Sequence, residues 1–310
     1  MIESQVAIQP HVYVILLTWN GWRDTIECLE SVFRLDYPCH TVIVCDNASS
    51  DGPMEKIEDW ASGRITASCD SPDLTRLVLP SIPKPVAFVS IDASEASTKR
   101  RSPDDRLVLI ERGANLGFAG GNNVGIRYAL DRCDCDYVWL LNNDTVVEPD
   151  SHSAIMRMAE ADPKLGICGS QLRSYAFPHE IQTMGGKKVQ SLERAHTASA
   201  GTHHAAGFDD SWRARLCGGG LYADKPQVSG GGGSARRELF LYYEELDLAA
   251  RVRPAFQLGY SPESVVYDKE GASIGSAHVR SNRSVLSDYY QARNRIVFSR
   301  RHHPWFLHPF

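Results

Sequence analysis

Carboxylate and amide side chains follow a strongly apolar run in the middle of the chain. Residues 137–141 (Tyr-Val-Trp-Leu-Leu) show no polar alternation, and Asn142, Asn143 and Asp144 come directly after them. Such a run predicts a strand buried on both faces, and open α/β sheets bind ligands beyond the carboxyl ends of their strands. One hard carboxylate beside amide oxygens suits Mg²⁺ or Mn²⁺ held against a diphosphate. The simpler interpretation is that these residues cap the helix expected after Pro149.

The same succession of apolar run, polar turn and helical pattern occurs earlier in the chain. Its polar turns hold Thr18 and Asn20 after residues 12–17, Asp46, Asn47 and Asp51 after residues 41–45, and Asn115, Gly117 and Gly121 after residues 107–110. Repetition of strand and helix predicts right-handed βαβ units and a mostly parallel sheet. Because every turn brings Asp or Asn to one edge, we expect a nucleotide site there.

Composition limits the class of protein. A chain of 310 residues with 43% apolar residues can bury one large core or two modest ones, and a net charge of -5 argues against nucleic-acid binding as the main activity. No apolar run approaches the length that spans a bilayer, and the N-terminus lacks a signal sequence, so we expect a cytoplasmic protein or one peripheral to the inner face of the cell membrane. The eight cysteines include no C-x-x-C pair, which favours reduced, structural thiols.

The organisation favours a single α/β domain over residues 1–300. Residues 10–150 form its nucleotide-binding half, interrupted by a Pro-, Ser-, Asp- and Lys-rich stretch at 62–105 that we expect to be a surface insertion or lid. Residues 151–283 form its second half, in which the glycine run near 230–234 predicts a flexible or altered connection. Residues 284–310 give a last helix and an aromatic, basic tail, which either contacts a membrane surface or packs on the domain.

Several ordered motifs resemble those of the family 2 glycosyltransferases. The motifs are Asp46-Asn47-x-Ser49-Ser50-Asp51, the Asn115–Asn123 segment, Leu140–Asp144, Phe240–Leu248, Val266–Ser273 and Tyr289-Tyr290-x-x-Arg293-Asn294-Arg295. They follow the family's order over most of residues 10–300 and are most similar to the rhamnosyltransferase-like bacterial enzymes. The resemblance implies the GT-A fold, a Rossmann-like, mostly parallel sheet flanked by helices, with an extension on the acceptor side. It makes residues 151–283 the acceptor and catalytic half, in which the altered connection at 230–234 weakens the acceptor pocket.

The resemblance also implies a reaction. It is the inverting transfer of a sugar, rhamnose in the named subgroup, from a nucleoside-diphosphate donor to a hydroxyl of a glycan or lipid-linked saccharide. The diphosphate needs Mg²⁺ or Mn²⁺ to neutralise its growing charge, and the hydroxyl needs a general base.

The resemblance places the metal and the base on particular residues. It makes Asp144 the metal-bridging carboxylate, with Asn142 in place of the first acidic residue of the metal motif. Asp268 stands where relatives usually carry His and is the second expected metal ligand. Glu245 stands where the family has its catalytic Asp, and Glu244 lies beside it. The aromatic residues at 240–243 favour partial burial of this pair, and hence a raised pKa, over a solvated acidic helix face.

The remaining positions are expected to contact the nucleotide. Asp46 would accept hydrogen bonds from the base or ribose, or else cap its own turn. Arg293 would steady the diphosphate, with a surface ion pair as an equal alternative. The other expected nucleotide-binding residues, some of which also shape the turns, are Thr18, Asn20, Asn47, Asp51, Asn115, Gly117, Gly121, Asn142 and Asn143.

Other functions stay open at this point. Asn142, Asp268 and the glycine run leave room for a relative that binds a nucleoside diphosphate without efficient catalysis. A nucleotidyltransferase would need a basic, glycine-rich loop after the first strand, and Thr18-Trp19-Asn20-Gly21 is not one. A dinucleotide oxidoreductase is weaker still, because no G-x-G-x-x-G follows any strand.

Overall fold

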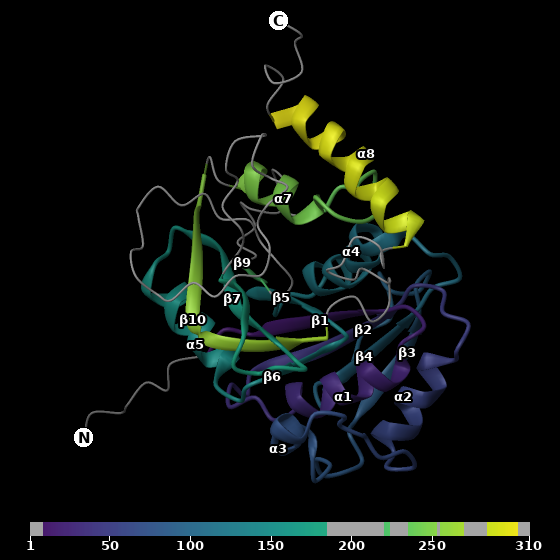
Figure 1. Cartoon of the computed structure of the whole chain (residues 1–310). Helices are drawn as coiled ribbons and strands as arrows, with labels where there is room; N and C mark the ends of the chain where they lie inside the picture. The colour runs from purple at the N-terminus through teal and green to yellow at the C-terminus, as the bar shows by residue number, and fades with distance from the viewer. Residues whose placement is uncertain (1–8, 185–219, 224–234, 253–254, 270–283, 303–310) are drawn as a thin grey trace, which may run out of the picture.

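Strands and helices alternate through the first half of the chain (Figure 1). The computed structural model describes residues 9–184, 220–223, 235–252, 255–269 and 284–302. Its first elements are β1 (Val12–Thr18), α1 (Trp22–Val32), β2 (His40–Asp46), α2 (Pro53–Ala61), the 3-10 helix η1 (Pro72–Leu74), α3 (Thr75–Val78), β3 (Phe88–Asp92), β4 (Leu107–Glu111), α4 (Gly117–Leu130), β5 (Tyr137–Asn142) and β6 (Thr145–Val147). The later elements are α5 (Ser151–Ala161), β7 (Leu165–Ser174), β8 (Ile181–Met184), β9 (Gly220–Ala223), α7 (Glu244–Val252), β10 (Gln257–Asp268) and α8 (Val285–His302).

One sheet runs through the molecule in the order β3-β4-β2-β1-β5-β9-β7-β10-β6, with β8 paired to β7. The strands from β3 to β5 are all parallel. β9 pairs antiparallel with both β5 and β7, while β7 and β10 run parallel to one another. The prediction of a mostly parallel α/β sheet flanked by helices is therefore confirmed.

Helices cover both faces of this sheet. Successive side chains of a strand point to opposite sides, so the apolar strands contribute to a core on each face. Val12, Val14 and Leu16 of β1 belong to the larger core, with residues of α1, α2, α3 and α5. Tyr13 and Ile15 belong to a second core with residues of α4. α7 adds a small apolar cluster on Ile167 of β7. Figure 1 shows α7 and α8 on the same side of the sheet as α4.

The stretch at 62–105 differs from the expected insertion or lid. It contributes β3, which pairs in parallel with β4 at the edge of the sheet. Its earlier part is held by Glu30 of α1, a fully buried carboxylate that accepts hydrogen bonds from Trp60 Nε1 and from the Ile82 backbone, both at 2.8 Å. The stretch is polar in composition, yet a few apolar side chains and one buried carboxylate fix it to the sheet.

Two expectations fall outside the described residues: the glycine run at 230–234 and the tail after His302. Among the helices that the structure does describe, we find none with the length and apolarity to cross a bilayer.

Candidate active site

The polar turns converge at the carboxyl edge of the parallel strands. In the sheet register Thr18 of β1 lies beside Asp46 of β2, and Leu17 lies beside Asn142 of β5. These three neighbouring strands therefore end at one level, and the side chains that follow them share an edge, as the repeated pattern predicts.

Ser49 and Ser50, which precede Asp51, connect the side chains of Asp46 and Asn20. The carboxylate of Asp46 accepts hydrogen bonds from the hydroxyl of Ser49 at 2.5 Å and from its backbone amide at 3.1 Å. Asn20, in the left-handed region with φ 53, accepts from the Ser50 amide at 2.7 Å. Burial raises the pKa of Asp46, and the Ser49 hydrogen bonds oppose that shift. Asp46 thus caps its own turn while remaining at the strand edge.

Asn47 and Asn115 join the second turn to the start of α4. The amide nitrogen of Asn47 donates to Asn115 Oδ1 at 2.9 Å, and its oxygen accepts from the Leu116 backbone at 2.9 Å. At Gly117 and Gly121 the space that a side chain would need is already filled by protein atoms. A Cβ on Gly117, where φ is +70, would lie 2.2 Å from the Phe240 carbonyl oxygen, and one on Gly121 would lie 2.4 Å from Leu17. These glycines permit close packing of α4, so any nucleotide contact there would fall to other atoms of the loop.

A buried threonine connects the first strand to the central polar turn. The hydroxyl of Thr25 on α1 lies 3.1 Å from the Thr18 hydroxyl and accepts from the Asn143 amide at 3.0 Å. Thr18 and Asn143 are both buried. Their side chains therefore set the geometry of the edge, and Asn143 has its amide nitrogen turned to α1.

Asp144 and Asp268 lie on paired segments. Asp268 pairs with Thr145 across β10 and β6, and the Lys269 amide donates to the Asp144 carbonyl at 3.1 Å. Asp144 is almost fully buried. No group of three His, Cys, Asp or Glu side chains that could hold a metal is found within the described ranges. Two carboxylates still suit Mg²⁺ or Mn²⁺, which commonly take one or two protein carboxylates and complete their shell with phosphate oxygens and water.

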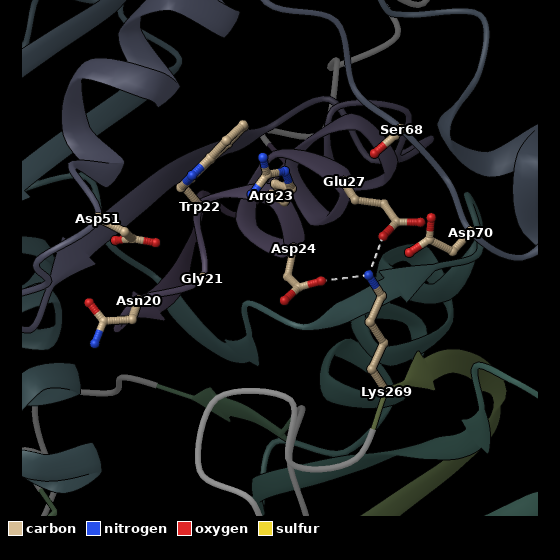
Figure 2. A pocket seen from close by; sticks show the side chains of 10 residues that line it. All are labelled: Asn20, Gly21, Trp22, Arg23, Asp24, Glu27, Asp51, Ser68, Asp70 and Lys269. Atoms are coloured by element: carbon tan, nitrogen blue, oxygen red, sulfur yellow. Dashed lines mark hydrogen bonds and ion pairs between the residues drawn. The ribbon is translucent and has the colours of Figure 1, made fainter.

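A polar pocket of about 430 Å³ opens over the first turn of α1 (Figure 2). Its lining residues are Asn20, Gly21, Trp22, Arg23, Asp24, Glu27, Asp51, Ser68, Asp70 and Lys269. Lys269 reaches across it to Asp24 Oδ1, at 2.6 Å, and to Glu27. Burial alone would lower the pKa of Lys269, but the two carboxylates hold it above its usual value. Asn20 and Asp51 lie on one side of the pocket, and Lys269, the residue after Asp268, lies on the other (Figure 2).

Glu244 and Glu245 begin α7 in a confined setting. Glu244 is 4% exposed, and its Oε2 atom is buried without a hydrogen-bond partner in the structure. Burial, together with the neighbouring Glu245, raises the pKa of Glu244 well above its ordinary value, and burial raises the pKa of Glu245 to about 7. A carboxyl group of this kind can take a proton near neutral pH. Asp247, on the next part of the helix, pairs with Arg251 at 2.8 Å, as its spacing predicts.

The acidic segment is attached to the nucleotide edge through the start of α4. The Phe118 amide donates to the Phe240 carbonyl at 2.7 Å, beside Gly117. On the other side, Arg293 of α8 donates to the Glu238 carbonyl at 2.8 Å. The guanidinium of Arg293 is therefore engaged with the backbone before the acidic helix, whereas we expected it at a diphosphate or in a surface ion pair.

Three residues of this region were not singled out from the sequence: Thr25, Glu27 and Asn294. Asp24 and Glu27 lie three positions apart on α1, a spacing that places both on one helix face. That spacing is the only local signal, since their partner Lys269 is 242 residues from Glu27.

Comparison with known proteins bears on this arrangement. The family described as Glycosyl transferase family 2 matches residues 90–215. A protein of Haloferax volcanii, the low-salt glycan biosynthesis hexosyltransferase Agl10, is 27% identical over 215 residues, which cover 68% of this chain and 66% of that protein. Residues 90–215 of this chain are thus similar to the family 2 glycosyltransferases. The alignment with the Haloferax volcanii protein covers just under two thirds of that protein's length.

Solved glycosyltransferase structures share the fold of this chain. The mannosyltransferase PcManGT from Pyrobaculum calidifontis, solved with GDP-Man and Mn²⁺, is 15% identical and gives a TM-score of 0.52, covering 86% of this chain and 59% of its own. TarS of S. aureus in complex with UDP is 12% identical with a TM-score of 0.50, covering 81% of this chain and 59% of its own. At such identities the likeness concerns the GT-A fold alone.

Proposed function

We propose that this protein transfers a sugar from a nucleoside-diphosphate donor to an acceptor hydroxyl, with inversion and with a divalent metal. The observation that most supports this proposal is that Asp144 and Asp268 lie on paired segments. These segments lie beside the ends of β1 and β2, which carry Thr18 and Asp46 at the same level of the sheet. Carboxylates suit a cation and the strand edge suits a nucleotide. The relative is a hexosyltransferase, and the structural neighbours were solved with GDP-Man and Mn²⁺ or with UDP.

Each group of residues has a part in this reaction. Asp144 and Asp268 would hold the metal, which when bound neutralises charge on the leaving diphosphate. Asp46 would accept hydrogen bonds from the nucleoside, beside Asn20. Glu245, with Glu244, would take the proton of the acceptor hydroxyl on the face of the sugar opposite the diphosphate, which gives inversion in a single displacement. A glycan or a lipid-linked saccharide is the acceptor class, and rhamnose on thymidine diphosphate is the first donor to test.

The metal assignment is tested with Asp144→Asn. Metal charge stabilisation is worth several kcal/mol, so we expect turnover to fall by roughly 100-fold or more. The measurement is release of nucleoside diphosphate from dTDP-rhamnose, GDP-mannose and UDP-GlcNAc, with Mn²⁺, with Mg²⁺ and with chelator. The matched control is Asp131→Asn, an exposed aspartate at the end of α4.

The outcomes separate the competing functions. Unchanged turnover in Asp144→Asn contradicts the metal site. Tight binding of a nucleoside diphosphate by calorimetry, with no turnover of any donor by the unaltered protein, favours the catalytically impaired relative instead.

Contact with an anionic membrane surface is a further part of the proposal. α8 exposes Val285, Leu286, Tyr289 and Ile296, of which Val285 is 87% exposed. Its last turn adds Arg300, Arg301 and His302. An apolar helix face flanked by arginines suits the boundary between headgroups and acyl chains of anionic lipids.

Sedimentation with vesicles tests this contact. We expect binding to phosphatidylglycerol vesicles, weak binding to phosphatidylcholine vesicles, and at least a several-fold loss in the double variant Tyr289→Ser, Ile296→Ser. Phe177→Ser, which removes an exposed apolar side chain elsewhere, is the matched control and should bind normally. Equal binding by both variants would contradict a role for α8.

A further inference from the structure

Two consecutive tyrosines adopt a rare backbone conformation directly before the acidic pair. Tyr242 and Tyr243 have φ values of 66 and 71. A side chain with a Cβ in this region costs on the order of 1–3 kcal/mol, and such residues persist only where their surroundings hold them. Because the turn immediately precedes Glu244, its two left-handed residues fix the direction in which α7 starts and where the two carboxyl groups lie.

The surroundings that hold this turn come from α8. Asn294 is fully buried, and its amide nitrogen donates to the carbonyl oxygens of Leu241, at 2.7 Å, and of Tyr242, at 3.1 Å. The amide oxygen of Asn294 accepts from Arg293 at 2.5 Å. The same arginine also donates to the Glu238 carbonyl. Thus one carboxamide donates hydrogen bonds to both carbonyl oxygens at the entry to the strained turn.

Three further contacts between α8 and residues 240–243 involve side chains alone. The Tyr242 hydroxyl lies 2.8 Å from the Ser287 hydroxyl, and the Phe240 ring stacks on Tyr290 with centroids 5.0 Å apart. The Tyr243 ring lies against that of Phe298, with centroids 5.7 Å apart. None of the three bonds to the backbone. Asn294 therefore differs from the other contacts of the helix, because it bonds to the backbone of the turn itself.

We propose that Asn294 is a positioning residue, whose carboxamide holds the Tyr242–Tyr243 turn and thereby sets the place and the burial of Glu244 and Glu245. This rests on the proposed function in one respect, the use of that pair as the general base. The chemistry is specific to an amide. An aspartate at 294 would set acceptor oxygens against two carbonyl oxygens, and an alanine would leave both carbonyls buried without donors.

The first experiment reads the geometry without turnover. The ¹³C resonances of the Glu244 and Glu245 carboxyl carbons are titrated in the full chain and assigned with Glu244→Gln and Glu245→Gln. We expect midpoints above the ordinary glutamate value in the unaltered protein, and a shift back toward that value in Asn294→Ala and Asn294→Asp. The control Ala292→Ser, on the exposed side of the same helix, should titrate normally. Unchanged midpoints in both Asn294 variants would overturn the proposal.

The second experiment separates positioning from mere helix packing. Displacement of a catalytic group by about 1 Å can cost on the order of 100-fold in rate, so we expect kcat of Asn294→Ala to fall roughly 10- to 100-fold with the KM for donor little changed. Glycine adopts positive φ without strain. In a Tyr243→Gly background the same Asn294→Ala change should therefore cost only about 3-fold or less. An equal loss in both backgrounds would mean that Asn294 only packs α8.

The two proposals can fail separately. If Glu244→Gln and Glu245→Gln both keep full transfer, the pair is not the base, while the carboxyl titration still decides whether Asn294 sets its burial. If those variants are inactive and the Asn294 variants match Ala292→Ser in every measurement, the base stands and the positioning role is refuted.

Discussion

At the scale of single residues, the acidic pair that begins α7 favours proton transfer but makes the fold less stable as pH rises. Burial raises the pKa of both carboxyl groups, which suits proton transfer near neutral pH. The folded state then holds protons that the unfolded state has already released, over the window between the ordinary and the raised pKa. The free energy of unfolding therefore falls as pH rises through that window.

Glutamine substitution should separate the two effects. We expect Glu245→Gln to lose most of its transfer activity and, above neutral pH, to unfold at a higher urea concentration than the unaltered protein. In the unaltered protein kcat/KM should fall as pH drops, because the pair becomes protonated, with a midpoint well above the ordinary glutamate pKa of about 4.3.

Enzyme assays and urea titrations from pH 5 to pH 8 check both expectations. Glu263→Gln, an exposed glutamate that pairs with Arg157, is the matched control. A kcat/KM that does not fall between pH 8 and pH 5, or a Glu245→Gln variant with full activity, would rule out this base.

The types of residue in the sequence predicted a good part of the site. Contacts between residues far apart in the chain could not be predicted. The polar ends of β1, β2 and β5 could be predicted because each follows a buried apolar run. In the structure the three strands end at one level of the sheet. The raised pKa of Glu245 also follows from its aromatic flank. In contrast, nothing local in the sequence indicates that Lys269 is held by Asp24 and Glu27, since those pairs join opposite ends of the chain. The strained turn before Glu244 is equally invisible, because tyrosine does not favour positive φ.

At the scale of elements, α4 is held against the sheet by glycine. A Cβ on Gly121 would lie 2.4 Å from the side chain of Leu17 of β1, so in Gly121→Ala either Leu17 or the helix must shift. We expect Gly121→Ala to lower the free energy of unfolding by about 1–3 kcal/mol, although alanine by itself favours helix by about 1 kcal/mol.

Urea unfolding measures this difference. Gly113→Ala is the matched control, since nothing lies within 4 Å of a Cβ there, and it should change stability little. A Gly121→Ala variant as stable as the unaltered protein would show that Leu17 or α4 can shift without cost.

The elements themselves were predicted unevenly. The helix expected after Pro149 is present as α5, Ser151–Ala161. The stretch at 62–105 was not recognised as part of the sheet, because β3 is short and its pairing with β4 depends on tertiary contacts. Residues 77–79, which carry a weak strand signal, fall mostly in α3, packed near α1.

At the scale of the whole molecule, two buried histidines make folding sensitive to acid. His152 is fully buried among the rings of Tyr37, His40 and Trp139, and neither of its ring nitrogens has a partner in the structure. Burial lowers the pKa of His40 to about 4 and that of His152 well below its usual value. Between those values and about 6.5 only the unfolded chain takes up protons, so the free energy of unfolding falls as pH drops.

The variant His152→Phe tests this acid sensitivity. Phenylalanine keeps an aromatic ring in the core and removes two polar atoms that lack partners, so we expect a higher free energy of unfolding, with the gain larger at pH 5 than at pH 7. In the unaltered protein the two histidines lower the free energy of unfolding as pH drops from 7 to 4.5, whereas the Glu244–Glu245 pair raises it over the same range. The difference between His152→Phe and the unaltered protein therefore isolates the contribution of His152.

Urea unfolding at several pH values supplies the measurement. His179→Phe is the matched control, because His179 lies in the exposed turn before β8. The same gain at both pH values would mean that packing, and not protonation, accounts for the difference.

The salt bridges of Lys269 also bear on synthesis of the chain. Asp24 leaves the ribosome early, and its cationic partner is made 245 residues later. A nascent chain that lacks β10 can assemble its first βα units, but it leaves two acidic side chains of α1 without their counter-charge. The charges of Asp24 and Glu27 are therefore balanced only once β10 has been made.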